Sequence, residues 1–206
     1  MRAVMPKIKK EWYDQMIVVD GGSTDGSLEY AQKQGYEAFV QQQKGFGAAY
    51  SEAVARSTGD ILIMFSPDGN SMPEKLPELT AKINEGYDMV IASRYAPGAK
   101  SDDDDPVTAF GNWMFTALFN VLFHGKITDS LVMYRAYRKD MLLDLKITTR
   151  TVSWGSQILA RALKAKKRIA EIPADEPARI GGVRKMSPIR NGLAELSMIF
   201  QEWRRG

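Results

Sequence analysis

Cysteine is absent from this chain of 206 residues, and histidine occurs once, at position 124. The protein can therefore form no disulfide bond, and no thiolate is available to bind zinc or to attack a substrate. The absence of cysteine fits a reducing compartment.

The excess of one sign of charge is also small, because the formal net charge is only +3. This excess of basic residues is too small to indicate nucleic-acid binding, and we expect no nucleic-acid partner. The basic side chains gather late in the chain, between Arg161 and Arg190. There they could meet a diphosphate or an anionic membrane surface, or form a solvated face.

Long hydrophobic runs are missing as well. The longest, at residues 110–123, is interrupted by Asn112, Thr116 and Asn120, and a membrane-spanning helix needs about 20 apolar residues. The chain also starts without the apolar stretch of a signal peptide. We expect a cytoplasmic protein. Its helix at 110–123 either lies at a membrane surface as a peripheral contact or packs on the core or on a second subunit of a homo-oligomer.

What the sequence does contain is a regular alternation of strand and helix patterns. Hydrophobic residues make up 44% and charged residues 26%, which is ordinary for one globular domain, here spanning residues 1–206. Short apolar runs predict strands at 16–20, 37–41, 61–65, 88–92, 132–136 and 168–172. Helices are predicted at 25–34, 48–56, 73–85, 110–123, 156–166 and in a final segment ending at 203. This order predicts an α/β layered fold with a mostly parallel sheet flanked by helices.

Acidic, glycine-rich turns follow two of the predicted strands. They read Asp20-Gly-Gly-Ser-Thr-Asp25 and Ser66-Pro-Asp68-Gly-Asn70. Ligands of open α/β sheets bind beyond the carboxyl ends of the strands. A carboxylate there can hold a ribose hydroxyl or a divalent cation, and glycine lets the backbone approach a phosphate. Either turn alone could be only a turn, but the two together favour a nucleotide and metal site.

Four adjacent carboxylates, at residues 102–105, form the most acidic stretch. Because like charges repel, we predict an extended, solvated loop here, with a metal or substrate role as the alternative.

Several short motifs, taken in order, resemble those of family 2 glycosyltransferases. The likeness covers about residues 16–186 and is greatest to dolichyl-phosphate mannose synthases and bacterial polyprenyl-phosphate glycosyltransferases. The segment Val18-Val-Asp20-Gly-Gly-Ser-Thr-Asp-Gly26 is similar to the family's Val-Asp-Asp-Gly-Ser-Thr-Asp-Gly. The other matches are Lys44-Gly-Phe-Gly47, Ser93-Arg-Tyr95, Thr128-Asp129, Tyr134-Arg-Ala136, and Arg179, Gly182 and Lys185 of an Arg-x-x-Gly-x-Ser-Lys pattern.

The resemblance implies a GT-A fold, a Rossmann-like layered arrangement. It also implies inverting transfer of a hexose from a UDP- or GDP-linked sugar to an acceptor such as a polyprenyl phosphate. Asp68 and Asn70 would hold Mg²⁺ or Mn²⁺, and Asp129 would be the catalytic residue, as general base or orienting carboxylate near the acceptor. The nucleotide-sugar would be bound by Asp20, Gly22, Lys44, Asp68, Ser93, Arg94, Arg135, Arg179 and Lys185.

The chain departs from the family pattern in several places. Gly21 stands where the first motif has its second Asp, and Ser66 replaces the first Asp of the metal motif. Met133 replaces a Gly, and Arg184 a Ser. The opening strand of the family is missing here or reduced to residues 3–5.

Two alternative functions remain open. A nucleotidyltransferase also combines an α/β sheet with a metal, but the lysine-rich activation expected near its first strand is absent. A non-catalytic or regulatory nucleotide-binding module derived from a glycosyltransferase is favoured by Gly21, Ser66 and the opening strand. Metal binding without turnover would identify such a module.

Overall fold

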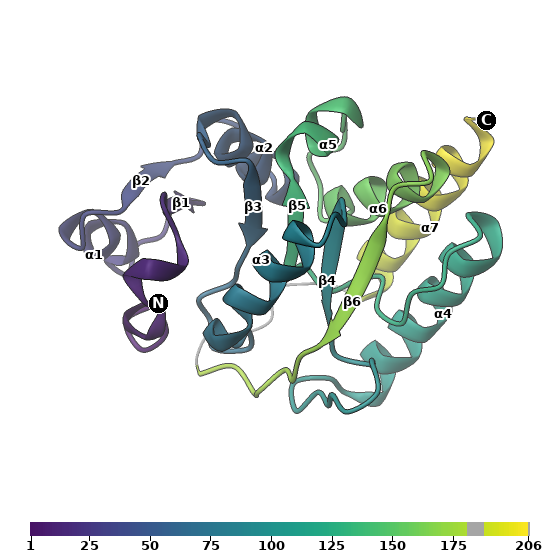
Figure 1. The fold of residues 1–206 in the computed structure, drawn as a ribbon, viewed down its shortest axis with the longest axis horizontal. Helices are drawn as coiled ribbons and strands as arrows, with labels where there is room; N and C mark the ends of the chain where they lie inside the picture. The colour runs from purple at the N-terminus through teal and green to yellow at the C-terminus, as the bar shows by residue number, and fades with distance from the viewer. Residues whose placement is uncertain (181–187, 206) are drawn as a thin grey trace.

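The structure is a computed structural model that describes residues 1–180 and 188–205. Figure 1 shows its strands and helices along the chain. The strands are β1 (Ile17–Asp20), β2 (Glu37–Val40), β3 (Ile61–Met64), β4 (Met89–Ser93), β5 (Arg135–Arg138) and β6 (Ile169–Pro173). The α-helices are α1 (Ser27–Lys33), α2 (Phe46–Arg56), α3 (Leu76–Asn84), α4 (Pro106–Leu122), α5 (Lys139–Asp144), α6 (Trp154–Lys164) and α7 (Pro188–Arg204). Three 3₁₀ turns lie at Met5–Lys7, Lys10–Trp12 and Pro73–Lys75.

Most elements lie where the sequence predicts them, within a few residues at each end. The strand expected at 132–136 instead spans Arg135–Arg138, because the preceding residues turn back around Asp129. Helix α5 was not predicted. Its six residues are too few to display a helical period.

The larger sheet has the order β3-β5-β4-β6. Strand β5 is antiparallel to both of its neighbours, and β4 and β6 are parallel. Hence β3, β4 and β6 all point the same way, and their carboxyl ends lie along one edge of the sheet. Strands β1 and β2 form a separate parallel pair. The predicted α/β layered fold is confirmed, with β5 making the larger sheet mixed.

Strand β4 shows how the sheet is covered on both faces. All five of its residues are buried, and successive side chains point to opposite faces. Val90 and Ala92 join a core cluster with Leu79 and Ile83 of α3. Met89 and Ile91 belong to the other cluster, which includes residues of α4, α6 and α7.

The start of the chain does not supply a strand. Met5 begins a 3₁₀ turn, and the first strand of the described residues starts at Ile17. The amino group of Met1 donates to the Pro67 carbonyl at 2.8 Å, and Ile8 and Trp12 pack against the cluster on the α3 face. Within the described residues no strand precedes β1, as one of the two predicted outcomes has it, and there β1 is hydrogen-bonded to β2 alone.

Within residues 1–180 and 188–205, no helix combines the length and apolar character that crossing a bilayer requires.

Candidate functional site

A cavity of about 280 Å³ lies beyond the carboxyl ends of β3, β4 and β6. The loop after β3 contributes Asp68 and Asn70, the end of β4 contributes Arg94, and the segment after β6 contributes Glu176 and Arg179. These residues are far apart in sequence but meet because the three strands run in the same direction. Four of them, Asp68, Asn70, Arg94 and Arg179, were predicted from the sequence.

Arg94 is the centre of the buried charge in this site. Its Nε donates to Asp129 Oδ2 at 2.7 Å and its Nη2 to Asp129 Oδ1 at 3.0 Å. Its Nη1 donates to Glu176 at 3.1 Å and lies 3.5 Å from Asp104. One guanidinium thus contacts three carboxylates, and the bidentate pair with Asp129 fixes its plane.

The protonation states of this pair follow from the contacts. Burial opposes ionisation of Asp129, but the Arg94 charge and its hydrogen bonds hold the pKa of Asp129 below its usual value. Burial would also lower the pKa of Arg94, yet the three carboxylates, Asp129 foremost, raise it. Both groups therefore stay charged, and Asp129 has no exposed surface.

Arg179 lies between two carboxylates at the other side of the cavity. Its Nη2 donates to Asp103 at 2.8 Å, and its Nη1 lies 3.8 Å from Asp68 Oδ2. The next residue, Ile180, donates its backbone N–H to the Asp68 carbonyl at 2.9 Å. The segment after β6 is thereby held against the Asp68 loop.

Gly69 allows this close approach. Its φ of +106° is favourable only for glycine, and an added Cβ would lie 2.6 Å from Cγ1 of Ile180. Any side chain at this position would push Ile180 away, and Arg179 with it.

The oxygen atoms of the Asp68 loop fit a hard divalent cation. Among the described residues, Asp68 Oδ1 accepts only a long 3.4 Å bond from the Asn70 N–H, and the side chain is partly exposed. Mg²⁺ and Mn²⁺ bind through one or two protein oxygens while keeping water and substrate phosphate ligands. The described residues contain no group of three His, Asp or Glu side chains arranged to hold a metal. A cation here would therefore depend on the substrate for its remaining ligands.

The run at residues 102–105 is only in part the solvated loop predicted from its charge, because Asp102 and Asp105 are exposed and Asp103 and Asp104 are not. Asp103 binds Arg179, Asp104 contacts Arg94 and the Tyr95 hydroxyl, and both are largely buried. Asp105 caps α4 by accepting from the backbone N–H groups of Val107 and Thr108. Nearby guanidinium groups and a helix end offset the repulsion that the sequence suggested.

Other predicted residues lie away from the cavity. Asp20, at the end of β1, accepts from the backbone of Gly22 at 2.9 Å and of Ser23 at 2.7 Å. Burial opposes its ionisation, but these bonds and the Ser23 hydroxyl lower the pKa of Asp20. Gly22 has a φ of +94°, which the turn requires. Lys44 is exposed in the loop before α2.

Two further predicted residues are fully buried. The Ser93 hydroxyl pairs with that of Thr128 at 2.6 Å. Arg135 donates to the Gly155 carbonyl at 3.0 Å and to the Ser130 carbonyl at 2.6 Å. Its guanidinium therefore holds backbone and does not line the cavity. Lys185 lies outside the described residues.

Glu176 and Glu171 were not predicted from the sequence. Glu176 accepts from Arg94, from Ser101 Oγ at 2.6 Å and from Asn70 Nδ2 at 3.4 Å. Glu171 accepts from the Thr128 backbone at 2.9 Å, and burial raises its pKa although these bonds oppose the shift. The position of Glu176 just after β6 was the available signal, because it is the same strand-end position that identified Asp68.

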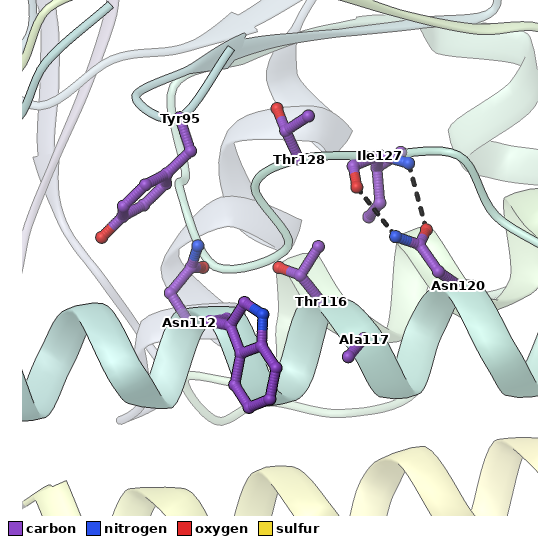
Figure 2. A pocket seen from close by; sticks show the side chains of 8 residues that line it. Tyr95, Asn112, Thr116, Ala117, Asn120, Ile127 and Thr128 are labelled. Carbon is purple, nitrogen blue, oxygen red and sulfur yellow. Dashed lines mark hydrogen bonds between the residues drawn. The ribbon is translucent and has the colours of Figure 1, made fainter.

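A second cavity, of about 320 Å³, lies between α4 and the loop that follows it. Figure 2 shows Asn112 and Thr116 on α4 together with Tyr95 and Thr128 at its lining, which also includes Trp113. Asn120 closes the loop by accepting from the Ile127 N–H at 3.0 Å and donating to its carbonyl at 2.9 Å. The walls are more strongly apolar than those of the first cavity.

Comparison with known proteins gives concordant results. Residues 10–145 match glycosyl transferase family 2. A dolichyl-phosphate hexose transferase of Haloferax volcanii is 30% identical over 87% of this chain and 77% of its own length. An undecaprenyl-phosphate mannosyltransferase of Micrococcus luteus is 29% identical over 84% of this chain and 75% of its own.

Solved structures agree on the fold. The glucosyl-3-phosphoglycerate synthase of Mycobacterium tuberculosis, crystallised with Mn²⁺, UDP-glucose and phosphoglyceric acid, superposes with a TM-score of 0.71. It is 20% identical, and the match covers 92% of this chain and 69% of that one. At this identity the likeness concerns the GT-A fold.

Proposed function

Because this chain belongs to glycosyl transferase family 2, we propose that it transfers a hexose from a UDP- or GDP-linked sugar to a polyprenyl phosphate, with inversion. An acceptor phosphate oxygen forms a bond to the anomeric carbon as the bond from that carbon to the diphosphate oxygen breaks. The nucleoside diphosphate leaves. The names of the Haloferax and Micrococcus relatives support this acceptor class.

The observation that carries the proposal is the meeting of Asp68, Asn70, Arg94 and Arg179 at the carboxyl ends of three parallel strands. Oxygen donors and guanidinium groups in one cavity suit a diphosphate and its cation. The proposed inversion corresponds to attack by the acceptor oxygen on the face of the sugar opposite the leaving diphosphate.

The charge balance supports a divalent cation. Among the described residues, five carboxylates contact the two guanidinium groups of the site; they are Asp68, Asp103, Asp104, Asp129 and Glu176, around Arg94 and Arg179. A diphosphate would be repelled by this excess of negative charge. Mg²⁺ or Mn²⁺ held by Asp68 and Asn70 would supply the positive charge that stabilises the leaving diphosphate.

The arginines have distinct proposed roles. Arg179 neutralises the diphosphate and exchanges its contact with Asp68 for one with phosphate. Arg94 faces the cavity, while Asp129, which is fully buried, acts as a positioning residue that orients the Arg94 guanidinium. A polyprenyl phosphate is already anionic and needs little help from a base. We leave Arg135 out of the phosphate-binding set, because it is fully buried outside the cavity lining and its Nη1 and Nη2 donate to backbone carbonyls.

A second candidate is a non-catalytic nucleotide-binding module. Gly21 and Ser66 lack the carboxylates of the family motifs, and in the part of the chain that the structure describes β1 pairs with β2 alone. These features weaken donor contacts while leaving the Asp68 loop in place.

The test is a thermal-shift panel of UDP, GDP and their hexose conjugates, with and without Mn²⁺, followed by turnover on a polyprenyl phosphate. A ligand that binds only the native state stabilises it by about 2.7 kcal/mol at 100 times its Kd. We expect a metal-dependent rise in Tm with one nucleotide, and product formation. A shift without turnover would favour the non-catalytic module, and no shift at all would refute the site.

Asp68→Asn should abolish the metal dependence. Loss of an outer-shell partner already weakens metal sites by about 10–100-fold, so replacing the carboxylate of a direct ligand by a neutral amide should weaken Mn²⁺ binding by about 100-fold or more. Asp175→Asn is the matched control, since it removes a charge from the lining of the same cavity and keeps an oxygen for the Lys100 N–H. Equal Mn²⁺ affinity in both variants would contradict the assignment of Asp68.

A further inference from the structure

Helix α4 presents a wholly apolar face to solvent. None of its 17 residues is charged. Its inner face buries Phe115 and Phe119, whereas Val107, Phe110, Trp113 and Val121 are all more than 60% exposed. Spacings of three, three and eight residues place these four on one side of a helix. A surface helix of a globular protein normally carries polar side chains on that side.

Helix α7 carries a second exposed apolar stripe. Ile189, Leu193, Phe200 and Trp203 are between 41% and 80% exposed, and their spacings of four, seven and three residues keep them on one face. The two helices pack side by side, with Gly192 of α7 close to the Phe115 ring of α4. Together they hold eight of the thirteen exposed large hydrophobic side chains of the described residues.

The exposed charges of α7 are of one sign. Its two acidic residues are buried, and Glu202 is paired with Arg161 at 2.8 Å. Arg190 and Arg204 are exposed. An anionic lipid bilayer has an apolar interior and anionic headgroups. Apolar and aromatic side chains bordered by arginines are complementary to both.

The α4 cavity is lined by residues of α4 and by neighbours of the polar site. Its lining includes Trp113 of α4, and Tyr95 and Thr128 line it from the segments beyond that helix (Figure 2). Tyr95 follows Arg94 directly, and Thr128 is bonded to Ser93. A group delivered along α4 from a bilayer would therefore arrive beside the Arg94 cluster.

We propose that the exposed faces of α4 and α7 dock the protein on an anionic lipid bilayer, with the α4 cavity as the entry for the lipid chain of the acceptor. This inference rests on the proposed function for the nature of that lipid. The docking itself rests on the two helices.

Vesicle binding tests the docking without any turnover. The full chain is titrated with vesicles of phosphatidylcholine alone and of phosphatidylcholine with phosphatidylglycerol, and binding is followed by co-sedimentation and by tryptophan emission. We expect binding to the anionic vesicles with a blue shift, because Trp113 and Trp203 leave water. Phe110→Ser combined with Leu193→Ser keeps both tryptophans and should weaken binding about tenfold or more.

The control is Val40→Ser combined with Leu143→Ser, which changes two exposed apolar side chains outside the two helices. This variant should bind vesicles like the unchanged protein, and its nucleotide-dependent thermal shift should match that of the Phe110/Leu193 variant. Equal loss in both variants, or no binding of the unchanged protein, would overturn the proposal. The proposal would also be overturned if the unchanged protein formed a dimer without lipid and only the Phe110/Leu193 variant were monomeric. The exposed faces of the two helices would then be covered by a second copy of the chain. Binding without transfer to polyprenyl phosphate would leave the docking intact and refute the proposed acceptor.

Discussion

At the scale of single residues, the pairing of Arg94 with Asp129 organises the site. Asp129 is separated from Arg94 by 35 residues, yet it accepts two side-chain bonds from that guanidinium. A buried charge that loses its partner is strongly destabilising. Asp129 therefore matters to folding as well as to the shape of the cavity.

Asp129→Asn should lower the free energy of unfolding by about 3 kcal/mol at pH 7, because it leaves Arg94 buried with only the more distant carboxylates. The folded-state pKa of Asp129 lies below its ordinary value, so this residue stabilises the fold above about pH 3.9 and loses that contribution as the pH falls. Urea unfolding across this range should show that the difference in the free energy of unfolding between the variant and the unchanged protein decreases as the pH falls.

Asp102→Asn is the control for that experiment. Asp102 is half exposed and lies 3.6 Å from the ammonium group of an exposed Lys100. Surface pairs of this kind contribute little, and we expect a change within about 0.5 kcal/mol. If the difference in the free energy of unfolding between Asp129→Asn and the unchanged protein did not change with pH, the ionised state of Asp129 would be contradicted.

At the scale of elements, the site depends on how the segment after β6 lies on the loop after β3. Ile180 occupies the space that a side chain at Gly69 would need. The position of Arg179 relative to Asp68 therefore depends on the absence of a side chain at Gly69, a residue that itself offers no group to bind a ligand.

Gly69→Ala should weaken Mn²⁺-dependent nucleotide binding and lower stability by about 1–3 kcal/mol, through the positive φ and the contact with Ile180. Gly98→Ala separates the two effects. Gly98 also has a positive φ, of +93°, but no atom lies within 4 Å of its added Cβ. Calorimetry with nucleotide and Mn²⁺ should find normal binding in Gly98→Ala and reduced binding in Gly69→Ala. Equal binding in the two variants would show that the Ile180 contact does not position the site.

At the scale of the whole molecule, stability should be uneven. Strand β4 is hydrogen-bonded on both sides and fully buried, while β1 belongs to a two-stranded sheet and is bonded on one side. Two-stranded sheets are marginal by themselves. Regions with few buried contacts open at lower free energy than the core.

Hydrogen exchange should reveal this difference. We expect the amides of Val18 and Val19 in β1 to exchange at least about tenfold faster than those of Val90 and Ile91 in β4. Matching protection in the two strands would mean that the β1–β2 pair opens only with the whole domain. Slower exchange of β1 on adding the nucleotide and Mn²⁺ would support the predicted contact through Asp20.

The sequence alone determined where most strands and helices lie and which strand ends carry the polar groups. Apolar periodicity and glycine positions are local properties, so the residue pattern by itself selects Asp68 and Asn70, and the family motifs add Arg94 and Arg179. The family resemblance was also visible in the sequence and is confirmed, and the described residues before Ile17 form no strand.

Only the tertiary structure decided how those residues are paired. Arg135 and Arg94 have the same side chain, but one is enclosed by backbone carbonyls and the other lines the cavity. Glu176 and the run at 102–105 joined the site through contacts across 75 or more residues. Burial and ion pairing depend on distances that packing sets between remote segments, and no local pattern of residues specifies those distances.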